Sequence, residues 1–192
     1  MRKLIESQLD EARYVLEEFV SDDSNITAIA RTAEILIASI QNGGKIITCG
    51  NGGSMTDAMH FAEELSGVFR HKRPALPAVS ISDPAHITCT ANDYGFESIF
   101  SRYIEALGKP GDVLLAISTS GNSQNILRAV EAARDKGMMV VGLTGKTGGL
   151  LSKCVDQEVR VTGRKYSDRI QEIHIKVLHI LVLLIEQGVD IA

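Results

Sequence analysis

The sequence has few cysteines, no excess of basic residues and no long hydrophobic run. Its 192 residues include three cysteines, Cys49, Cys89 and Cys154, and no C-x-x-C pair. An odd number of widely spaced cysteines argues against a disulfide framework and a thiolate zinc site, and favours a reducing cytoplasm. The formal net charge of −4 argues against a nucleic-acid partner, because nucleic-acid binders usually carry a basic excess.

No segment of the sequence suggests association with a membrane. The longest apolar run, Val177 to Ile185, is interrupted by His179 and falls well short of the roughly 20 residues that a membrane span requires. The start, Met1-Arg-Lys-Leu-Ile-Glu, contains no apolar signal core. With 44% hydrophobic and 23% charged residues, the composition is that of one globular domain, which we expect to span residues 1–192.

Hydrophobic periodicity predicts helices and strands that alternate along most of the chain. Two stretches of residues 1–41 have helical spacing, and Asn42-Gly43-Gly44 ends the second of them. After them we expect strands at 45–49, 78–81, 112–117, 138–143 and 156–161, and helices at 54–65, 97–107, 122–136 and 167–186. This alternation predicts an α/β fold, a three-layer α-β-α sandwich on a five-stranded parallel sheet with extra N-terminal helices.

The helix expected at 167–186 is apolar over most of its circumference. A helix that is apolar all round must be covered on all sides, and one sheet covers only one side. We therefore expect helices of a second subunit to cover the remaining surface.

The first loop expected to bind a ligand follows the strand at 45–49 and reads Cys49-Gly-Asn-Gly-Gly-Ser. Open parallel sheets bind ligands at the carboxyl ends of their strands, and glycines let the backbone approach a ligand in front of a helix N-terminus. The loop departs from the dinucleotide fingerprint G-x-G-x-x-G, because Met55 stands at the last glycine position. No nucleotide cofactor is expected, and a tight turn without a ligand stays an alternative.

The second loop follows the strand at 112–117 and reads Ser118-Thr-Ser-Gly-Asn-Ser. Hydroxyl groups and helix N–H groups suit a phosphate monoester, which needs several hydrogen-bond donors around its oxygens. The alternative is a simple helix cap, which requires one hydroxyl rather than four. The composition of the loop therefore favours a phosphate site.

Two helices carry the candidate acids, bases and metal ligands. His60 and Glu64 are four residues apart, so they share one helix face and can hold a metal, act as an acid/base pair or form an ordinary surface pair. His179 interrupts an apolar stripe and is either a core histidine or part of a functional site. Gln171 lies roughly 12 Å from His179 along an ideal helix, so the two do not easily hold one ion. Asn92-Asp93 fits a turn or a contact to sugar hydroxyls.

Five segments together resemble a known protein family. They are Cys49-Gly-Asn-Gly-Gly-Ser, His60-Phe-Ala-Glu-Glu-Leu, Ala91-Asn-Asp-Tyr-Gly-Phe, Ile117-Ser-Thr-Ser-Gly-Asn-Ser and Arg169-Ile-Gln-Glu-Ile-His. Over essentially the whole chain the sequence resembles the sugar isomerase (SIS) fold and, more narrowly, the bacterial phosphoheptose isomerases. The serine loop alone indicates only the SIS superfamily.

The resemblance implies a flavodoxin-like SIS fold with the helical segment 1–41 at an oligomer interface. It implies an aldose–ketose isomerase that converts sedoheptulose 7-phosphate to D-glycero-D-manno-heptose 7-phosphate through an enediol. This reaction is the first step toward the ADP-heptose of lipopolysaccharide cores. Members of the family are typically cytoplasmic homotetramers with active sites at subunit contacts and, in several cases, zinc. One zinc ion per subunit is therefore expected.

The resemblance also implies roles for individual residues. Glu64 is expected to be the catalytic base and His179 its acid/base partner. The implied zinc ligands are His60, Glu64, Gln171 and His179. The implied substrate-binding residues are Asn51, Gly52, Gly53, Glu64, Asn92, Asp93, Ser118, Thr119, Ser120, Ser123, Asp168 and Gln171.

One departure from the family concerns Val68, where an arginine is expected. Its substrate contact is then either absent or supplied by Arg70, in a basic run at 70–73 that otherwise reads as a solvated loop. Two non-catalytic alternatives share the fold, namely binding of a replication initiator and sensing of a sugar phosphate. The initiator-binding group loses the acid/base residues and the sensors carry a DNA-binding domain. The presence of Glu64 and His179 in a single domain therefore favours catalysis, on this substrate or on a shorter sugar phosphate.

Overall fold

A five-stranded parallel sheet forms the centre of the molecule. The computed structural model describes residues 1–163 and 165–189, so the end of the predicted domain, residues 190–192, lies outside the described residues. The strands are β1 (Ile46–Gly50), β2 (Ala78–Ser80), β3 (Val113–Ser118), β4 (Met139–Gly145) and β5 (Gln157–Val161). They are all parallel and lie in the order β2-β1-β3-β4-β5, which confirms the predicted sheet.

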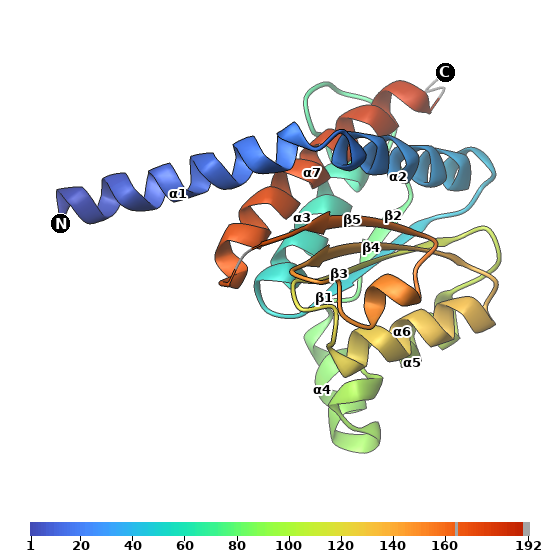
Figure 1. Cartoon of the computed structure of the whole chain (residues 1–192). Coiled ribbons are helices and arrows are strands. Elements are labelled where there is room, and N and C mark those ends of the chain that lie inside the picture. Colours follow the sequence, from blue (N-terminus) through green and yellow to red (C-terminus); the bar gives the residue numbers. More distant parts are fainter. Residues whose placement is uncertain (164, 190–192) are drawn as a thin grey trace.

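Helices cover both faces of this sheet, as Figure 1 shows. One face is covered by α1 (Arg2–Ser21), α2 (Asp23–Gln41), α3 (Gly53–Ser66) and α7 (Ser167–Gly188), the other by α4 (Pro84–Tyr94), α5 (Ser101–Leu107) and α6 (Gln124–Asp135). Alternate residues of a strand point to opposite faces, so Ile46 and Ile47 enter different hydrophobic clusters. The predicted three-layer sandwich is confirmed. None of the described helices is long and apolar enough to cross a membrane.

Two elements differ from the predicted positions. The helix expected at 97–107 is divided into a short 3₁₀ turn, Phe96–Ser98, and helix α5. Helix α4 was not among the predicted elements. Its only buried residue is Thr90, so its sequence has no apolar stripe from which a helix could be predicted. The Asp83 side chain caps α4 by accepting a hydrogen bond from the His86 N–H, and Pro84 occupies its first turn.

Helix α7 is covered largely by helices of its own chain. It packs against α2 and α3 over its length and against α1 near its start. Helices α2 and α3 thus cover part of the surface that the sheet leaves open, and cover by helices of a second subunit stays a prediction. Ile180 is still 44% exposed.

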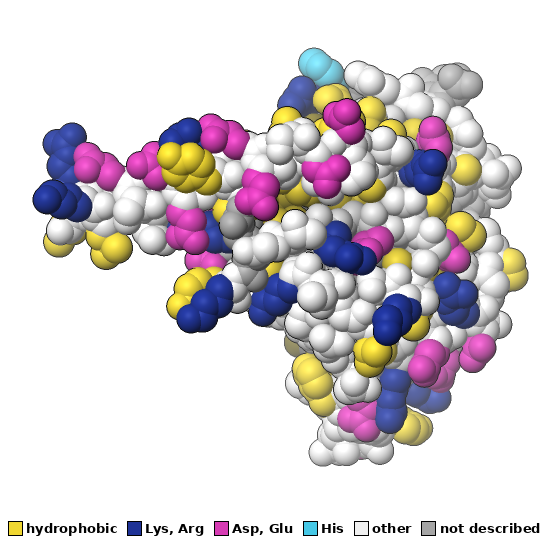
Figure 2. All heavy atoms as spheres, in the orientation of Figure 1, with side chains coloured by type: hydrophobic (Ala, Val, Ile, Leu, Met, Phe, Trp, Pro, Cys, Tyr) yellow, Lys and Arg dark blue, Asp and Glu magenta, His cyan; other side chains and the backbone are white. Residues whose placement is uncertain are grey.

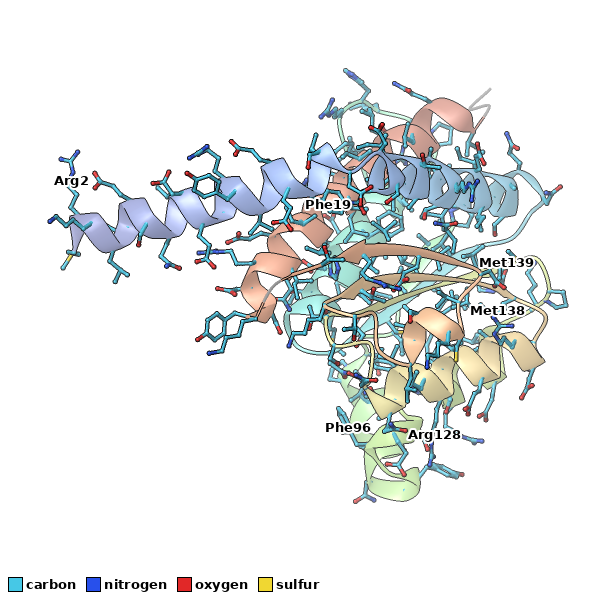
Figure 3. The ribbon with its side chains drawn as sticks, in the orientation of Figure 1. Arg2, Phe19, Phe96, Arg128, Met138 and Met139 are labelled. Atoms are coloured by element: carbon cyan, nitrogen blue, oxygen red, sulfur yellow. The ribbon has the colours of Figure 1, made fainter. Side chains whose placement is uncertain are left out.

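The N-terminal half of α1 projects beyond the body of the protein (Figure 1). Near its other end Val15 and Phe19 are buried against the body, and Figure 3 labels Phe19 there. Along the projecting half, Leu4 and Leu9 are 65% and 67% exposed. Hydrophobic side chains thus lie among charged ones on this projecting segment (Figure 2).

Candidate active site

The two predicted ligand loops lie side by side at one edge of the sheet. Strands β1 and β3 are neighbours, and Gly50 is in register with Ile117, so the loops leave the sheet at adjacent points. Between them is a cavity of about 210 Å³. It is lined by Asn51, Ser54, Ile117, Ser118, Thr119, Ser123, Ser167 and Gln171. The structure therefore brings both loops and the start of α7 to one polar cavity.

The serine loop lines this cavity with the hydroxyl side chains of Ser118, Thr119 and Ser123. The N–H of Gly121 donates to Ser118 Oγ at 3.1 Å, which curls the loop back toward the end of β3. Gly121 has φ +65°, and a Cβ there would collide with the Gly148 carbonyl, so this turn requires glycine. Ser123 precedes α6 but its side chain makes no capping hydrogen bond, which argues against the helix-cap alternative. The first N–H groups of α6 therefore remain without a side-chain partner and can bind an anion.

A pair of asparagines joins the two loops. Asn51 Nδ2 donates to Asn125 Oδ1 at 2.9 Å, and Asn125 Nδ2 donates back to Asn51 Oδ1 at 2.8 Å. Asn125 lies in the first turn of α6 and is 2% exposed. Sequence reasoning missed Asn125, although a polar residue next to the apolar stripe that begins at Ile126 was an available signal. Ser167, whose hydroxyl accepts a hydrogen bond from Thr119 at 3.2 Å, was also missed.

The glycine loop brings α3 close to α7. The Gln171 side chain packs directly on Gly53, where a Cβ would lie 2.6 Å from Gln171 Nε2. Any larger residue would push Gln171 away from the cavity. Gly53 thus marks a close approach between α3 and α7 that positions the Gln171 side chain.

Further along the same two helices, three predicted metal ligands come together. His60 and Glu64 lie on α3, and His179 lies on α7. His60 Nε2 is 2.9 Å from His179 Nε2 and 3.4 Å from Glu64 Oε1. One ligand atom from each of the three residues lies within 4.8 Å of the others. Glu64 is 15% exposed and His60 37% exposed, so the cluster is reachable from solvent.

This donor set fits a zinc ion. Two nitrogens bound to a tetrahedral zinc lie ~3.3 Å apart, close to the observed separation of the two histidine Nε2 atoms. His60 Nδ1 lies 3.4 Å from Glu63 Oε1, so a proton on Nδ1 leaves the Nε2 lone pair facing His179. The fourth predicted ligand, Gln171, packs its amide against Gly53, two helical turns from His179 along α7, and stays a prediction.

Two groups near the cluster have shifted pKa values. Partial burial, and after it the charge of His60, lowers the pKa of His179, which favours the neutral ring that a metal or a proton-transfer step requires. Burial raises the pKa of Asp57 to about 6, and its Oδ2 is buried without a hydrogen-bond partner among the described residues. Asp57 lies one turn before His60 on α3 and was not predicted as a site residue.

The loop after α3 folds over His179. The Phe69 ring lies 5.7 Å from the His179 ring, and the Arg70 guanidinium lies 5.3 Å from the Phe69 ring centroid. Val68 is 55% exposed. Arg70 thus lies near the cluster, and its substrate contact in place of an arginine at position 68 stays a prediction.

The remaining predicted residues lie at the surface. Asn92 and Asp93 form the last turn of α4, where Asn92 Nδ2 donates to Asp93 Oδ1 at 2.7 Å. They line neither the cavity at the serine loop nor the neighbouring cavity of about 310 Å³. That second cavity is bordered by Asn51, Ser123 and Phe96, which Figure 3 labels beside the start of α6. Asp168 is exposed in the first turn of α7 and accepts a hydrogen bond from the Arg169 N–H.

The chain is similar to known proteins over nearly its full length. Residues 9–145 match the SIS domain family. A phosphoheptose isomerase of Photorhabdus laumondii is 60% identical over 184 residues, which cover 96% of this chain and 95% of that protein.

Two solved structures share the fold closely. A phosphoheptose isomerase of Francisella tularensis superposes with a TM-score of 0.91 at 40% identity, over 96% of this chain and 97% of that one. The phosphoheptose isomerase of Neisseria gonorrhoeae superposes with a TM-score of 0.90 at 36% identity, over 97% and 98% of the two chains. By fold, motifs and full-length similarity, the chain belongs to the phosphoheptose isomerase family of SIS-domain proteins.

Proposed function

We propose that this protein converts sedoheptulose 7-phosphate to D-glycero-D-manno-heptose 7-phosphate, the first step toward ADP-heptose. The observation that carries the proposal is the placement of the cavity and the cluster on the same two helices. Gly53 and Gln171 lie at the cavity, while His60 and His179 lie about 10–12 Å further along α3 and α7. A substrate with its phosphate on C7 and its reacting carbons at C1 and C2 needs two such separated sites.

The serine loop is the proposed phosphate site. The hydroxyls of Ser118, Thr119 and Ser123, which line the cavity, would surround the phosphate oxygens together with the first N–H groups of α6. Ser120, whose hydroxyl accepts a hydrogen bond from the Asn122 N–H, stays a predicted fourth contact. The glycine loop, Asn51 to Gly53, and Gln171 would bind the sugar next to it. Asn92, Asp93 and Asp168 stay predictions for contacts to sugar hydroxyls.

Proton transfer is assigned to Glu64 and His179. The Glu64 carboxylate removes a proton from C1 of the ketose while the His179 ring donates a proton to O2, which gives the enediol. His179 then takes the proton from O1 as Glu64 returns a proton to C2, and the aldose forms. The lowered pKa of His179 makes its ring a stronger acid, which favours donation of its proton to O2.

His60, Glu64 and His179 would hold the zinc ion, with Gln171 as the proposed fourth ligand. Zinc, when bound, would polarise the substrate carbonyl. Because Gln171 is two turns away in this chain, the complete set would need a bent α7 or a site that draws on a neighbouring subunit.

The assembly is proposed to be a homotetramer with active sites at subunit contacts. The exposed apolar side chains of the projecting half of α1, including Leu4 and Leu9, support an interface on the segment 1–41. The cytoplasm remains the expected compartment, since all three cysteines are free thiols.

Turnover of sedoheptulose 7-phosphate, followed as formation of the aldose phosphate, tests the proposal. The parent should turn over, while Glu64→Gln and His179→Ala should not. Glu131→Gln is a matched control, because Glu131 is an exposed carboxylate on α6 across the sheet. Loss of turnover with chelator, and its return with zinc, would support the metal. No turnover by the parent with zinc present would overturn the assignment.

A further inference from the structure

Arg73 does not behave as a residue of a solvated basic loop. Its side chain is 6% exposed, although it belongs to the run Arg70-His-Lys-Arg that reads as solvated in the sequence. A guanidinium buried to this degree needs partners for its N–H groups, because an unpaired buried charge is strongly unfavourable. Its partners all come from α3, from α7 and from the loop that joins α3 to β2.

Two of these partners are carbonyl groups at the C-terminal end of α3. Arg73 Nη2 donates to the Glu64 carbonyl at 2.6 Å, and Nη1 donates to the Leu65 carbonyl at 2.7 Å. The Leu65 carbonyl also accepts a hydrogen bond from the Leu76 N–H at 3.0 Å, and a cation is favoured at this negative end of the helix dipole. Arg73 therefore fixes the backbone of Glu64, whose carboxylate belongs to the His/Glu cluster.

A further donor of Arg73 reaches α7, in addition to the contacts of Nη1 with the Pro74 and Gly67 carbonyls at 3.1 and 3.4 Å. Arg73 Nε donates to Glu186 Oε1 at 2.7 Å, and the Glu186 side chain is 12% exposed. Glu186 lies seven residues after His179, so it is on the same face of α7, two turns further along. One guanidinium thus connects the two helices that supply His60, Glu64 and His179.

We propose that Arg73 is a positioning residue that sets the distance between α3 and α7 and thereby holds His60 and Glu64 against His179. The planar guanidinium makes this connection possible, because its donors point in fixed directions to a carboxylate and to two carbonyls at once. The inference rests on the proposed function of the cluster as a metal and proton-transfer site.

Cobalt binding provides the test. Protein stripped of metal with chelator would be titrated with Co²⁺ and followed by visible absorption, for the parent, Arg73→Met and Arg134→Met. Arg134 is the matched control, because it donates to the Cys154 carbonyl at 2.7 and 3.0 Å and lies 3.5 Å from Asp156, on the other face of the sheet. Thermal unfolding of each metal-free protein would give the folded fraction.

We expect Arg73→Met to bind Co²⁺ about tenfold more weakly per folded molecule, as for loss of groups that orient metal ligands. Its kcat should fall with little change in KM, because the serine loop is not touched. Arg134→Met should bind Co²⁺ like the parent. If Arg73→Met does not fold, Glu186→Gln keeps the side-chain volume and removes the charge, and the same direction of change is expected.

Parent-like Co²⁺ affinity in a folded but less stable Arg73→Met, or in its substitute Glu186→Gln, would overturn the inference and leave the proposed function intact. A parent that binds no Co²⁺ would overturn the metal site itself and the inference with it. The two failures are therefore distinguishable in one experiment.

Discussion

The cavity at the serine loop and the His/Glu cluster are built in different ways. Most of the cavity comes from two short continuous segments, each of which follows a strand and precedes a helix. The cluster joins His60 with His179, which are 119 residues apart, through side chains alone. A site made by backbone and short hydroxyl side chains tolerates small shifts of its helices. A site made by three converging side chains depends on the distance between α3 and α7, as the contacts of Arg73 illustrate.

Substitutions in the His/Glu cluster should cause the largest loss of activity. Glu64→Gln should lower kcat by about 10²–10⁴-fold, because general base catalysis contributes in this range. KM should change little, since the phosphate site is intact. Steady-state kinetics of the purified variant give both values. A rise in KM with unchanged kcat would show that Glu64 binds substrate and takes no proton.

At the serine loop we expect a substitution to change KM rather than kcat. Ser123→Ala should raise KM by about tenfold with little change in kcat, because a hydrogen bond to a charged group is worth about 1.5–3 kcal/mol. Inorganic phosphate should inhibit the parent more strongly than this variant. Equal inhibition of both proteins would contradict the phosphate assignment.

A smaller effect, on stability, is expected where the two loops meet. Asn125→Ala leaves the Asn51 amide without its partner and should lower the free energy of unfolding by about 1–3 kcal/mol. Urea unfolding measures this directly. The substitution should also raise KM, and a destabilised variant with parent-like KM would mean that the asparagine pair does not shape the cavity.

The smallest change should be in the pH dependence of stability, through the Asp57 carboxyl group. Burial raises the folded-state pKa of Asp57 from the ordinary value of 3.8 to about 6, so the ionised carboxylate destabilises the folded state increasingly as the pH rises toward 6. In metal-free protein, Asp57→Asn should gain stability over the parent between pH 4 and 6 and keep that gain above it. The gain should be about 1 kcal/mol, discounted for partial exposure. Urea unfolding at several pH values measures this gain in stability. A gain that does not change with pH would contradict the raised pKa of Asp57.

Much of this molecule could be predicted from the sequence, and the reasons differ by region. The buried strands are apolar runs that end in glycine- or serine-rich loops. Hydrophobic periodicity therefore predicts the strands of the sheet and, with them, the positions of both ligand loops. Helix α4 was not, because only Thr90 is buried along it. The residues of the His/Glu cluster could be named from the family resemblance, but the distances between their side chains depend on how α3 packs against α7. The burial of Arg73 could not be predicted either, because an arginine in a basic run has the same local sequence whether it is exposed or buried between two helices.

The central claim is that Glu64 moves a proton at one end of a substrate whose phosphate is held at the other. Isomerisation of sedoheptulose 7-phosphate in deuterated water, followed by NMR, tests it most directly. We expect deuterium at C2 of the aldose product with the parent, and loss of both product and exchange with Glu64→Gln while substrate still binds. Exchange that proceeds equally in Glu64→Gln, or a parent that forms no product, would contradict it.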